Sequence, residues 1–528
     1  MKNYSIQISL IFALVTLFAS CDSKKVNKEK VKQPISYTYE TSLSLMPGTK
    51  APALQSFAHG SIGTEWILLA GRTNKNDSVG GLHNLHANYA DSSFIPRSYN
   101  GDMYWYDVST PSTPAMSINF ADLITVLRDN LCPIIGLRDN SECESHLNNL
   151  LEVFNSSNPL VTQNGDFLYM LGGYGPLDGD TNNYQTFNSL AQIHLPTAMN
   201  VVKGNHEQIS DEQWSNFIRI GIDTTNTLVS TGAELFYINN TFYLAGGHNF
   251  GDSASSGGQK YLDAVYAFTI ADKGTFELDL TVTDSISDKI NPKDSISDIT
   301  SIFRRRDGPV VPALFKNPKT GNLDQGLSFY GGVFKHSKPA QKDSLFAWND
   351  AIYVHPSWNT SGKNFTYDST YNQNNHNLYA CGNFVAYDSL LGEVHTFLYG
   401  GIGTGNYSGP NKLSGFTNNG MHITLDLDSL KSRNKVITDI FNSDTTKIYG
   451  AESVLILNDE LTYYQTKAGV TTEIVDLATT FKNGDSIDIG YIYGGIEAFS
   501  QNPGSYGPSN SAASDKIWKV TLTRVAKK

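Results

Sequence analysis

The sequence predicts an all-β protein made of repeated small sheets, and three observations support this fold class. The first is composition: of 528 residues only 17% are charged, whereas there are 45 Gly, 28 Tyr and 26 Phe, a mixture that suits short strands and tight turns. The second is an apolar strand ending in Gly-Gly that recurs along the chain. The third is the context of each copy, which has a turn before it and a long loop and another apolar strand after it.

The repeated Gly-Gly strands mark equivalent units. The turns Asn164-Gly165 and Asn239-Asn240, which favour hairpins, precede two of them. A more variable strand, such as 275–283, often closes the unit. The strict copies end at Gly173, Gly247, Gly332, Gly401 and Gly495, and a sixth, degenerate copy, WILLAGR, has Gly71 followed by Arg72. The predicted third strands are 103–108, 190–195, 264–270, 351–356, 421–427 and 516–522.

This unit of strand, turn, strand, Gly-Gly, long loop, strand and variable strand resembles the kelch motif over most of residues 50–525. The resemblance implies a six-bladed kelch-like β-propeller of the galactose-oxidase type. The units are longer than the roughly 50 residues typical of kelch repeats: Gly173 and Gly247 are 74 residues apart (247 − 173), and Gly401 and Gly495 are 94 apart (495 − 401). We place the excess in loops and expect the glycines to serve close packing near the axis.

Two segments bear on how the ring closes and how many blades it has. Residues 35–45 alternate as a strand does, and we predict that they form the outer strand of the last blade, beside 516–522. Residues 460–477 contain further strand-like sequence, so a seventh blade stays open. The apolar spacing of 119–154 is closer to helical period, which predicts a small helical insertion that covers an edge or, as the alternative, docks a partner.

Four cysteines are present. Cys132 and Cys143 are close enough in sequence to form a disulfide that staples the insertion, or they are two separate buried thiols. Cys381 is expected to be a small buried strand residue.

The N-terminus predicts export. Lys2 is followed by an apolar run from Ile6 to Phe18, which is short for a bilayer span but suits a signal peptide. The ending Ala19-Ser20-Cys21 resembles the lipobox of bacterial lipoproteins, although Phe18 departs from its usual pattern. The resemblance implies that 1–20 is removed, that Cys21 is acylated and that 21–34 is a flexible tether to a propeller over 35–528. The predicted location is the bacterial cell envelope, in the outer membrane; an ordinary secretory signal is the alternative.

Charge and motifs exclude several functions. The formal net charge of −12 repels phosphate backbones, so we expect no nucleic-acid partner. No zinc, phosphate-loop or dinucleotide motif occurs in a suitable context. Asp178, Asp180 and Asn182 resemble the start of a calcium loop, but Asn183 and Ser189 stand where Gly and Glu are needed. We therefore predict no metal and no cofactor.

The candidate binding residues come from loops that a propeller brings to one face. The loops after the doublets contribute Tyr174, His248, Phe250, His336 and Tyr407, and the loops leading into the first strands contribute Glu234, Arg306, Asp307 and Glu452. Aromatic rings supply contact area, while two or more carboxylates beside a guanidinium suit a polar ligand or acid–base chemistry. Loop packing and ordinary salt bridges at the rim are the alternatives.

These observations support two hypotheses. The favoured one is a membrane-tethered binding or assembly module that recognises a glycan, a peptide or an envelope protein through its long loops. The alternative is a glycan-active enzyme of the epimerase or lyase kind, because propellers carry both functions. Convergence of Glu234, Arg306, Asp307 and Glu452 on one deep pocket favours the enzyme, and separation around a shallow rim favours the binding module.

Overall fold

The protein is described by a computed structural model, in which one unit spans Tyr39–Arg524 and a second contains the two chain ends, 1–38 and 525–528. Cys21, the predicted signal peptide, the tether 21–34 and Tyr407 lie outside the described residues. The structure describes residues 37–73, 98–136, 143, 147, 150, 152–177, 183–250, 259–274, 276–288, 301–333, 335–336, 345–357, 364–373, 380–401, 415–442, 444, 446–500 and 511–526.

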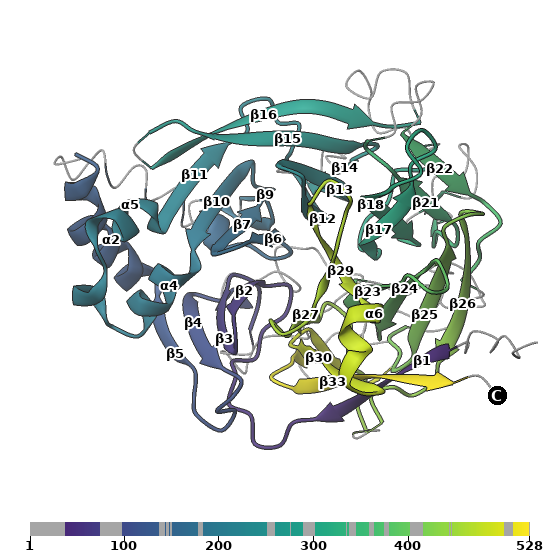
Figure 1. The fold of residues 1–528 in the computed structure, drawn as a ribbon. Coiled ribbons are helices and arrows are strands. Elements are labelled where there is room, and N and C mark those ends of the chain that lie inside the picture. The colour runs from purple at the N-terminus through teal and green to yellow at the C-terminus, as the bar shows by residue number, and fades with distance from the viewer. Residues whose placement is uncertain are drawn as a thin grey trace, which may run out of the picture. The chain divides into compact units, whose positions relative to one another are not determined.

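Six four-stranded antiparallel units, here called blades 1 to 6, follow one another in chain order around a common centre (Figure 1). Blade 1 contains β2 (Ala58–Ile62), β3 (Glu65–Leu69), β4 (Asp102–Asp107) and β5 (Met116–Asn119). Blade 2 contains β6 (Leu160–Asn164), β7 (Phe167–Leu171), β10 (Ser189–His194) and β11 (Ile218–Ile222). Blade 3 contains β12 (Thr231–Ile238), β13 (Thr241–Phe250), β15 (Val265–Asp272) and β16 (Glu277–Ile286). The protein is thus a β-propeller, as the repeats predicted.

The remaining blades follow the same order from inner to outer strand. Blade 4 contains β17 (Val310–Lys316), β18 (Leu323–Tyr330), β21 (Ala351–Val354) and β22 (Phe365–Asp368). Blade 5 contains β23 (Gly382–Asp388), β24 (Glu393–Tyr399), β25 (Gly420–Asp426) and β26 (Lys431–Ile437). Blade 6 contains β27 (Val454–Leu457), β30 (Ser486–Tyr493), β33 (Ile517–Ala526) and β1 (Tyr37–Leu45). Each predicted third strand overlaps the third strand of its blade.

Blade 6 closes the ring with strands from both ends of the repeat region. Its order is β1-β33-β30-β27, so β1 is the outer strand beside β33. This confirms the role predicted for residues 35–45. Because β1 precedes blade 1 in the chain whereas β33 follows every other strand, the ring is closed by contacts between residues far apart in sequence.

The glycine doublets sit at matching positions, where the second strand of each blade ends. All five strict doublets have positive φ at both positions, and in the degenerate copy Ala70 (φ 57°) and Gly71 (φ 77°) do the same. At Gly247 (φ 85°), an added Cβ would lie 2.5 Å from Ala233 Cβ and 2.9 Å from the Thr231 carbonyl. Close approach of the neighbouring backbone therefore requires glycine there.

Each junction between adjacent blades has its own apolar core. Six clusters of buried side chains lie at the six junctions, among the residues that the structure describes. The junction of blades 6 and 1, for example, contains Phe57, Trp66 and Tyr493. Central strands buried on both faces have nearly continuous apolar sequences, as in EWILL and FLYML.

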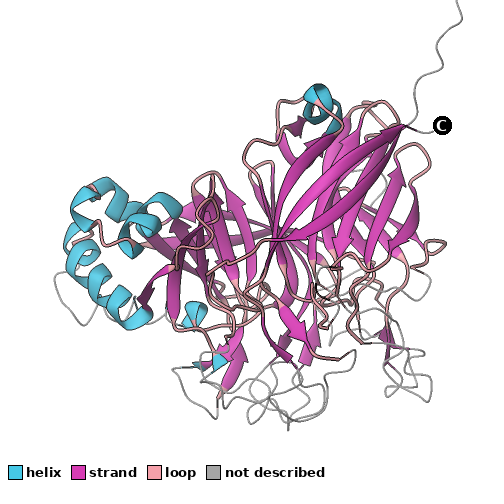
Figure 2. Ribbon diagram, turned by 90° about the horizontal axis from the view of Figure 1, so that it is seen from below, coloured by secondary structure: helices cyan, strands magenta, loops and turns pink. Residues whose placement is uncertain are grey.

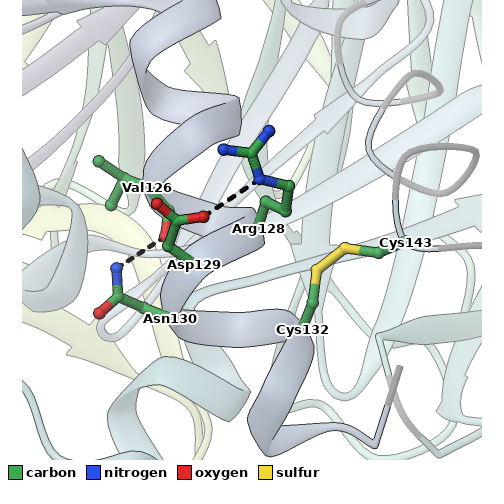
Figure 3. Close-up of a disulfide and its surroundings, with 6 residues drawn as sticks. All are labelled: Val126, Arg128, Asp129, Asn130, Cys132 and Cys143. Atoms are coloured by element: carbon green, nitrogen blue, oxygen red, sulfur yellow. Dashed lines mark hydrogen bonds and ion pairs between the residues drawn. A yellow bond between two sulfur atoms is a disulfide. The ribbon is translucent and has the colours of Figure 1, made fainter. Parts of the chain in front are cut away.

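A group of helices packs beyond the outer strands of blades 1 and 2 (Figures 1 and 2). Helix α2 (Phe120–Ile134) begins after Asn119, whose side chain caps the Asp122 amide. Cys132 forms a disulfide with Cys143 (Figure 3), with a Cα–Cα distance of 6.2 Å. Two further helices, α4 (Leu195–Val202) and α5 (Asp211–Phe217), join β10 to β11 and were not predicted. Their buried faces extend the same apolar cluster, which supports edge covering as the role of the insertion.

The strand-like segment 460–477 forms a hairpin and not a seventh blade. Strands β28 (Tyr463–Gln465) and β29 (Thr471–Asp476) lie between β27 and β30 in the chain, followed by α6 (Leu477–Thr480) and the short η6 (Phe481–Asn483). Strand β29 pairs in parallel with β23, the inner strand of blade 5. The hairpin of blade 6 therefore extends the inner edge of its neighbour.

Short ribbons begin several of the loops after the doublets. They pair β8 (Tyr174–Pro176) with β9 (Tyr184–Thr186), β13 with β14 (Gln259–Tyr261), β19 (Lys335–His336) with β20 (Leu345–Phe346), and β31 (Ile496–Ala498) with β32 (Ser511–Ala513).

Candidate functional site

The loops that lead into the first strands form a hydrogen-bonded ring around the axis, here called the inner ring. Its members are Ser56, Asn158, Gly232, Asp307, Ala380 and Glu452, one from each blade in order. Backbone amides of Asn158, Asp307, Ala380 and Glu452 donate to the carbonyls of Ser56, Gly232, Asp307 and Ala380, at 3.0, 3.0, 3.0 and 2.8 Å. Apart from Ala380, every member has positive φ. The inner ring shows that these loops meet at one depth, as the repeat predicted.

Side chains complete the inner ring at its two remaining junctions. The Thr231 hydroxyl donates to the Asn158 carbonyl at 3.1 Å. Gln55 Nε2 donates to Glu452 Oε2 at 2.9 Å, and the Ser56 hydroxyl donates to the same oxygen. Glu452 thus links blade 6 to blade 1. Burial raises the pKa of its carboxyl, and the positive charge of Arg72 and these hydrogen bonds oppose the shift.

Two arginines compensate the acids of the inner ring. Arg306 Nε lies 3.0 Å from Asp307 Oδ2, and Arg72, which is 2% exposed, interacts electrostatically with Glu452. Arg306 Nη1 also lies 2.9 Å from His248 Nε2. Because a guanidinium only donates, His248 accepts through this nitrogen and is neutral; burial and the Arg306 charge lower its pKa well below the ordinary range.

A cavity of about 920 Å³ runs along the axis beneath the inner ring. Here it is called the axial cavity. Inner strands of all the blades line it, and alternation places His59 and Ser61 of blade 1 and Val310 and Pro312 of blade 4 on its wall. Pro312 is tolerated because an inner strand is an edge strand. Five aromatic residues are part of the lining: Phe57, Phe236, Tyr237, Phe384 and Tyr463. The side chains of Phe57, Phe236 and Phe384 also belong to the buried cores between blades.

The axial cavity reaches the surface on the side of the hairpin turns. Its lining includes the exposed turn residues Asn164, Gly165, Asn239 and Asn240, whereas at the other end it finishes at the inner ring. The β28–β29 hairpin adds Glu473 and its neighbours to the wall. The cavity therefore opens on the face opposite to the loops that follow the doublets.

The charged side chains of the lining are all carboxylates: Glu234, Asp307, Glu452, Asp459 and Glu473. Burial, with a contribution from the Asp307 charge, raises the pKa of Glu234 to about 8. Burial raises the pKa of Glu473 to about 7 and lowers that of His59 to about 4. Near neutral pH the cavity therefore holds acids that are partly protonated and a neutral imidazole.

The predicted charged residues separate into two groups. Glu234, Asp307 and Glu452 line the axial cavity, while Arg306 points to His248 and is not among the lining residues. Three of the four thus converge on one deep pocket.

The predicted aromatic residues pack within the opposite face. Tyr174, Phe250 and two other tyrosines, Tyr99 and Tyr184, form a cluster, and His248 lies against the Tyr261 ring with a centroid distance of 5.7 Å. The backbone of His336 lies in β19. For Tyr174, His248 and Phe250 the structure supports loop packing, the alternative considered above.

Sequence reasoning missed His59, Arg72 and Glu473. Arg72 could have been noticed in the sequence, because it follows the degenerate doublet directly and none of the strict doublets is followed by arginine. His59 is the second residue of the inner strand β2. An alignment of the blades could have assigned this position to the cavity. No sequence signal marked Glu473 as a cavity residue, because the pairing of β29 with β23 joins segments almost ninety residues apart.

Among the described ranges, no group of three or more His, Cys, Asp or Glu side chains is placed to hold a metal ion. In the same part of the chain, no helix has the length and apolar character needed to cross a bilayer.

Fold and site together define a class: a six-bladed β-propeller with an acidic axial cavity that opens beside the hairpin turns. No family model matches the sequence, and no curated protein matches it. Among solved structures, one titled "Structure of YjhT" is similar at 11% identity and a TM-score of 0.40, over 90% of this chain and 99% of that chain. The fold assignment rests on the sheet topology of this chain.

Proposed function

We propose that this protein is an exported, lipid-anchored β-propeller of the bacterial cell envelope that binds a glycan or a peptide in its axial cavity. The observation that carries the proposal is the cavity itself. Its volume of about 920 Å³ lies in the upper part of the range of about 300–1,000 Å³ found for ligand pockets. It combines aromatic walls with amides and carboxyls, the groups that fix the orientation of a polar ligand.

Export and anchoring are supported by the sequence. The apolar run before Cys21 and the polar segment after it are typical of a lipoprotein signal and tether. Metabolic labelling with palmitate tests this part: we expect label on the wild-type protein and none on Cys21→Ser. Equal labelling of both proteins would contradict lipid attachment at Cys21.

The long loops after the doublets remain a second predicted recognition surface, for an envelope protein. Tyr407 and parts of these loops lie outside the described residues, and Tyr99, Tyr174, Tyr184 and Phe250 of the described parts are packed together. The cavity therefore supports the binding role more directly than these loops do.

A blocked cavity tests the proposal. Ser61 lines the axial cavity, and no hydrogen bond of its hydroxyl is found among the described residues, so Ser61→Trp places a large ring in the cavity. Ser117→Trp, at an exposed position on β5 of the same blade, is the matched control. On glycan and peptide arrays we expect ligands of the wild type to bind the control equally and the blocked variant at least tenfold more weakly. A ligand set unaffected by Ser61→Trp would contradict binding in the cavity.

A glycan-active enzyme is the second candidate function. It is favoured by Glu234, whose pKa of about 8 suits a general acid near neutral pH, in a deep cavity shared with Asp307. Glu234→Gln separates the two functions. An enzyme would keep binding its glycan but lose turnover, whereas a binding module shows no turnover in either form.

A further inference from the structure

The charges of the axial cavity are not balanced. Of its five carboxyls, Asp307 and Glu452 interact with Arg306 and Arg72 at the inner ring, and Asp459 accepts a hydrogen bond from the Gly63 amide. Glu234 and Glu473 line the same cavity from β12 and β29. Within the described part of the chain, neither carboxyl has an ion pair or a hydrogen bond.

The surroundings of these two carboxyls suit a particular ligand chemistry. A carboxyl group held away from bulk water is either protonated or, when it is ionised, needs an accompanying cation to offset the cost of burying its charge. The lining also includes the half-buried aromatic residues Tyr237 and Tyr463, and aromatic rings attract ammonium groups. A cavity of about 920 Å³ is far larger than a bare ion needs, so its size and apolar walls favour an organic cation.

We propose that the axial cavity binds an alkylammonium ligand, with Glu234 and Glu473 as the carboxylates that receive its ammonium groups. The inference rests on the proposed function, because it names the chemical class of the ligand in the same cavity. Two kinds of ligand carry such an alkylammonium group: a free polyamine and the lysine side chain of a peptide. The cavity opens beside the exposed turns Asn164-Gly165 and Asn239-Asn240, which gives either ligand a route inward.

Ionisation of Glu234 gives the proposal a measurable pH dependence. The titratable groups that share its cavity are those of Asp307, Glu452, Asp459, Glu473, His59, Cys381, Tyr237 and Tyr463. The Asp307 charge raises the pKa of Glu234, and burial, assisted by the Glu234 charge, raises that of Cys381 to about 12. Since Glu234 is mostly protonated at pH 6.5, an ammonium ligand must displace a proton. A lysine ammonium, with a pKa of about 10.4, stays charged, so affinity increases as the pH rises from 6.5 to 8.5.

Calorimetry on the full chain in mild detergent tests this. The probes are spermidine, the tripeptide acetyl-Gly-Lys-Gly-amide and its Nε-acetyl-lysine counterpart. We expect at least one cationic probe to bind at least tenfold more tightly than the acetylated peptide at pH 8.5, and more weakly at pH 6.5. Buffers of different ionisation enthalpy should report proton release on binding at pH 6.5. Preference for spermidine or for the tripeptide identifies the source.

Matched variants locate the binding. Glu234→Gln and Glu473→Gln should each weaken the cationic probe at least tenfold and abolish part of the proton release. Glu40→Gln removes an exposed carboxyl from the outer strand β1 and should change nothing. Unchanged binding in both cavity variants, equal binding of the acetylated peptide, or binding of Ca²⁺ in preference to every amine would overturn the inference. A neutral array ligand lost in Ser61→Trp would sink this inference while leaving the proposed function standing.

Discussion

The hydroxyl of Tyr39 donates a 2.6 Å hydrogen bond to the carboxylate of Asp388, although 349 positions separate the two residues. Tyr39 lies in β1, the strand that closes blade 6, and Asp388 ends the inner strand of blade 5. The Tyr39 ring also packs into the core between these blades. The closing strand is therefore fastened to both blade 6 and blade 5.

Removing this hydrogen bond should loosen the closure. For Tyr39→Phe we expect the free energy of unfolding to fall by about 1.5–3 kcal/mol, because the bond is to a charged group and is buried. Urea unfolding measures this. Tyr491→Phe is the control, since its ring packs against Trp66 and no hydrogen bond of its hydroxyl is found in the described ranges. Equal losses in the two variants would show that the Tyr39–Asp388 bond has no special role.

Gly247 and Gly274 have the same φ of 85°. Comparing alanine substitutions at the two positions therefore distinguishes the cost of close packing from the cost of backbone strain. An added Cβ at Gly247 meets Ala233 and the Thr231 carbonyl, whereas at Gly274 it meets nothing within 4 Å. We expect Gly274→Ala to cost about 1 kcal/mol, the strain of positive φ alone, and Gly247→Ala at least about 3 kcal/mol because the neighbouring backbone must move. Thermal unfolding of the two variants compares them, and similar melting temperatures would refute the packing role of the doublet.

Neutralising Glu234 should stabilise the protein at alkaline but not at acidic pH. Its pKa is raised in the folded state from 4.5 to about 8, so below pH 4.5 both states are protonated and the group has no effect. As pH rises from 4.5 to 8, the unfolded state loses its proton first and stability falls. Glu234→Gln should therefore match the wild type at pH 4 and exceed it at pH 8 by at most a few kcal/mol, at about 1.4 kcal/mol per pKa unit.

Melting temperatures from pH 4 to pH 9 measure this difference, with Glu40→Gln as the exposed control. A constant difference between Glu234→Gln and the wild type across that range would contradict a raised pKa for Glu234.

The disulfide should stabilise the insertion without affecting the cavity. Cys132 and Cys143 are separated by 11 positions, and closing a loop of this size contributes roughly 2–3 kcal/mol. The double variant Cys132→Ser/Cys143→Ser should melt at a lower temperature, equal to that of the reduced wild type, and should bind ligand as the oxidised wild type does. Lost binding would show that the helices communicate with the cavity.

The fold was predictable because its determinants are local. Each repeat unit shows its own backbone requirements in its glycine doublet, its hairpin turn and its alternating third strand. Repetition of the unit then predicted the ring. Even the closing strand could be assigned, because apolar and polar side chains alternate over residues 35–45 and this segment belongs to none of the six repeat units.

The parts that were missed depend on tertiary contacts. Helices α4 and α5 occupy a connection between two strands of one blade, and their apolar residues suit a strand or a helix until the neighbouring α2 is placed. The hairpin β28–β29 has strand-like sequence that left a seventh blade open, and only its pairing with β23 shows its role. The inner ring holds Asp307 and Glu452, and Glu234 of β12 lines the same cavity, but the arrival of Glu473 follows from that distant pairing.

A crystal structure with the cationic ligand of highest affinity tests the central claim most directly. We predict that the ligand lies inside the axial cavity, with an ammonium nitrogen within hydrogen-bond distance of Glu234 or Glu473. A ligand seated on the loops that follow the glycine doublets, with the axial cavity free of it, would contradict the account.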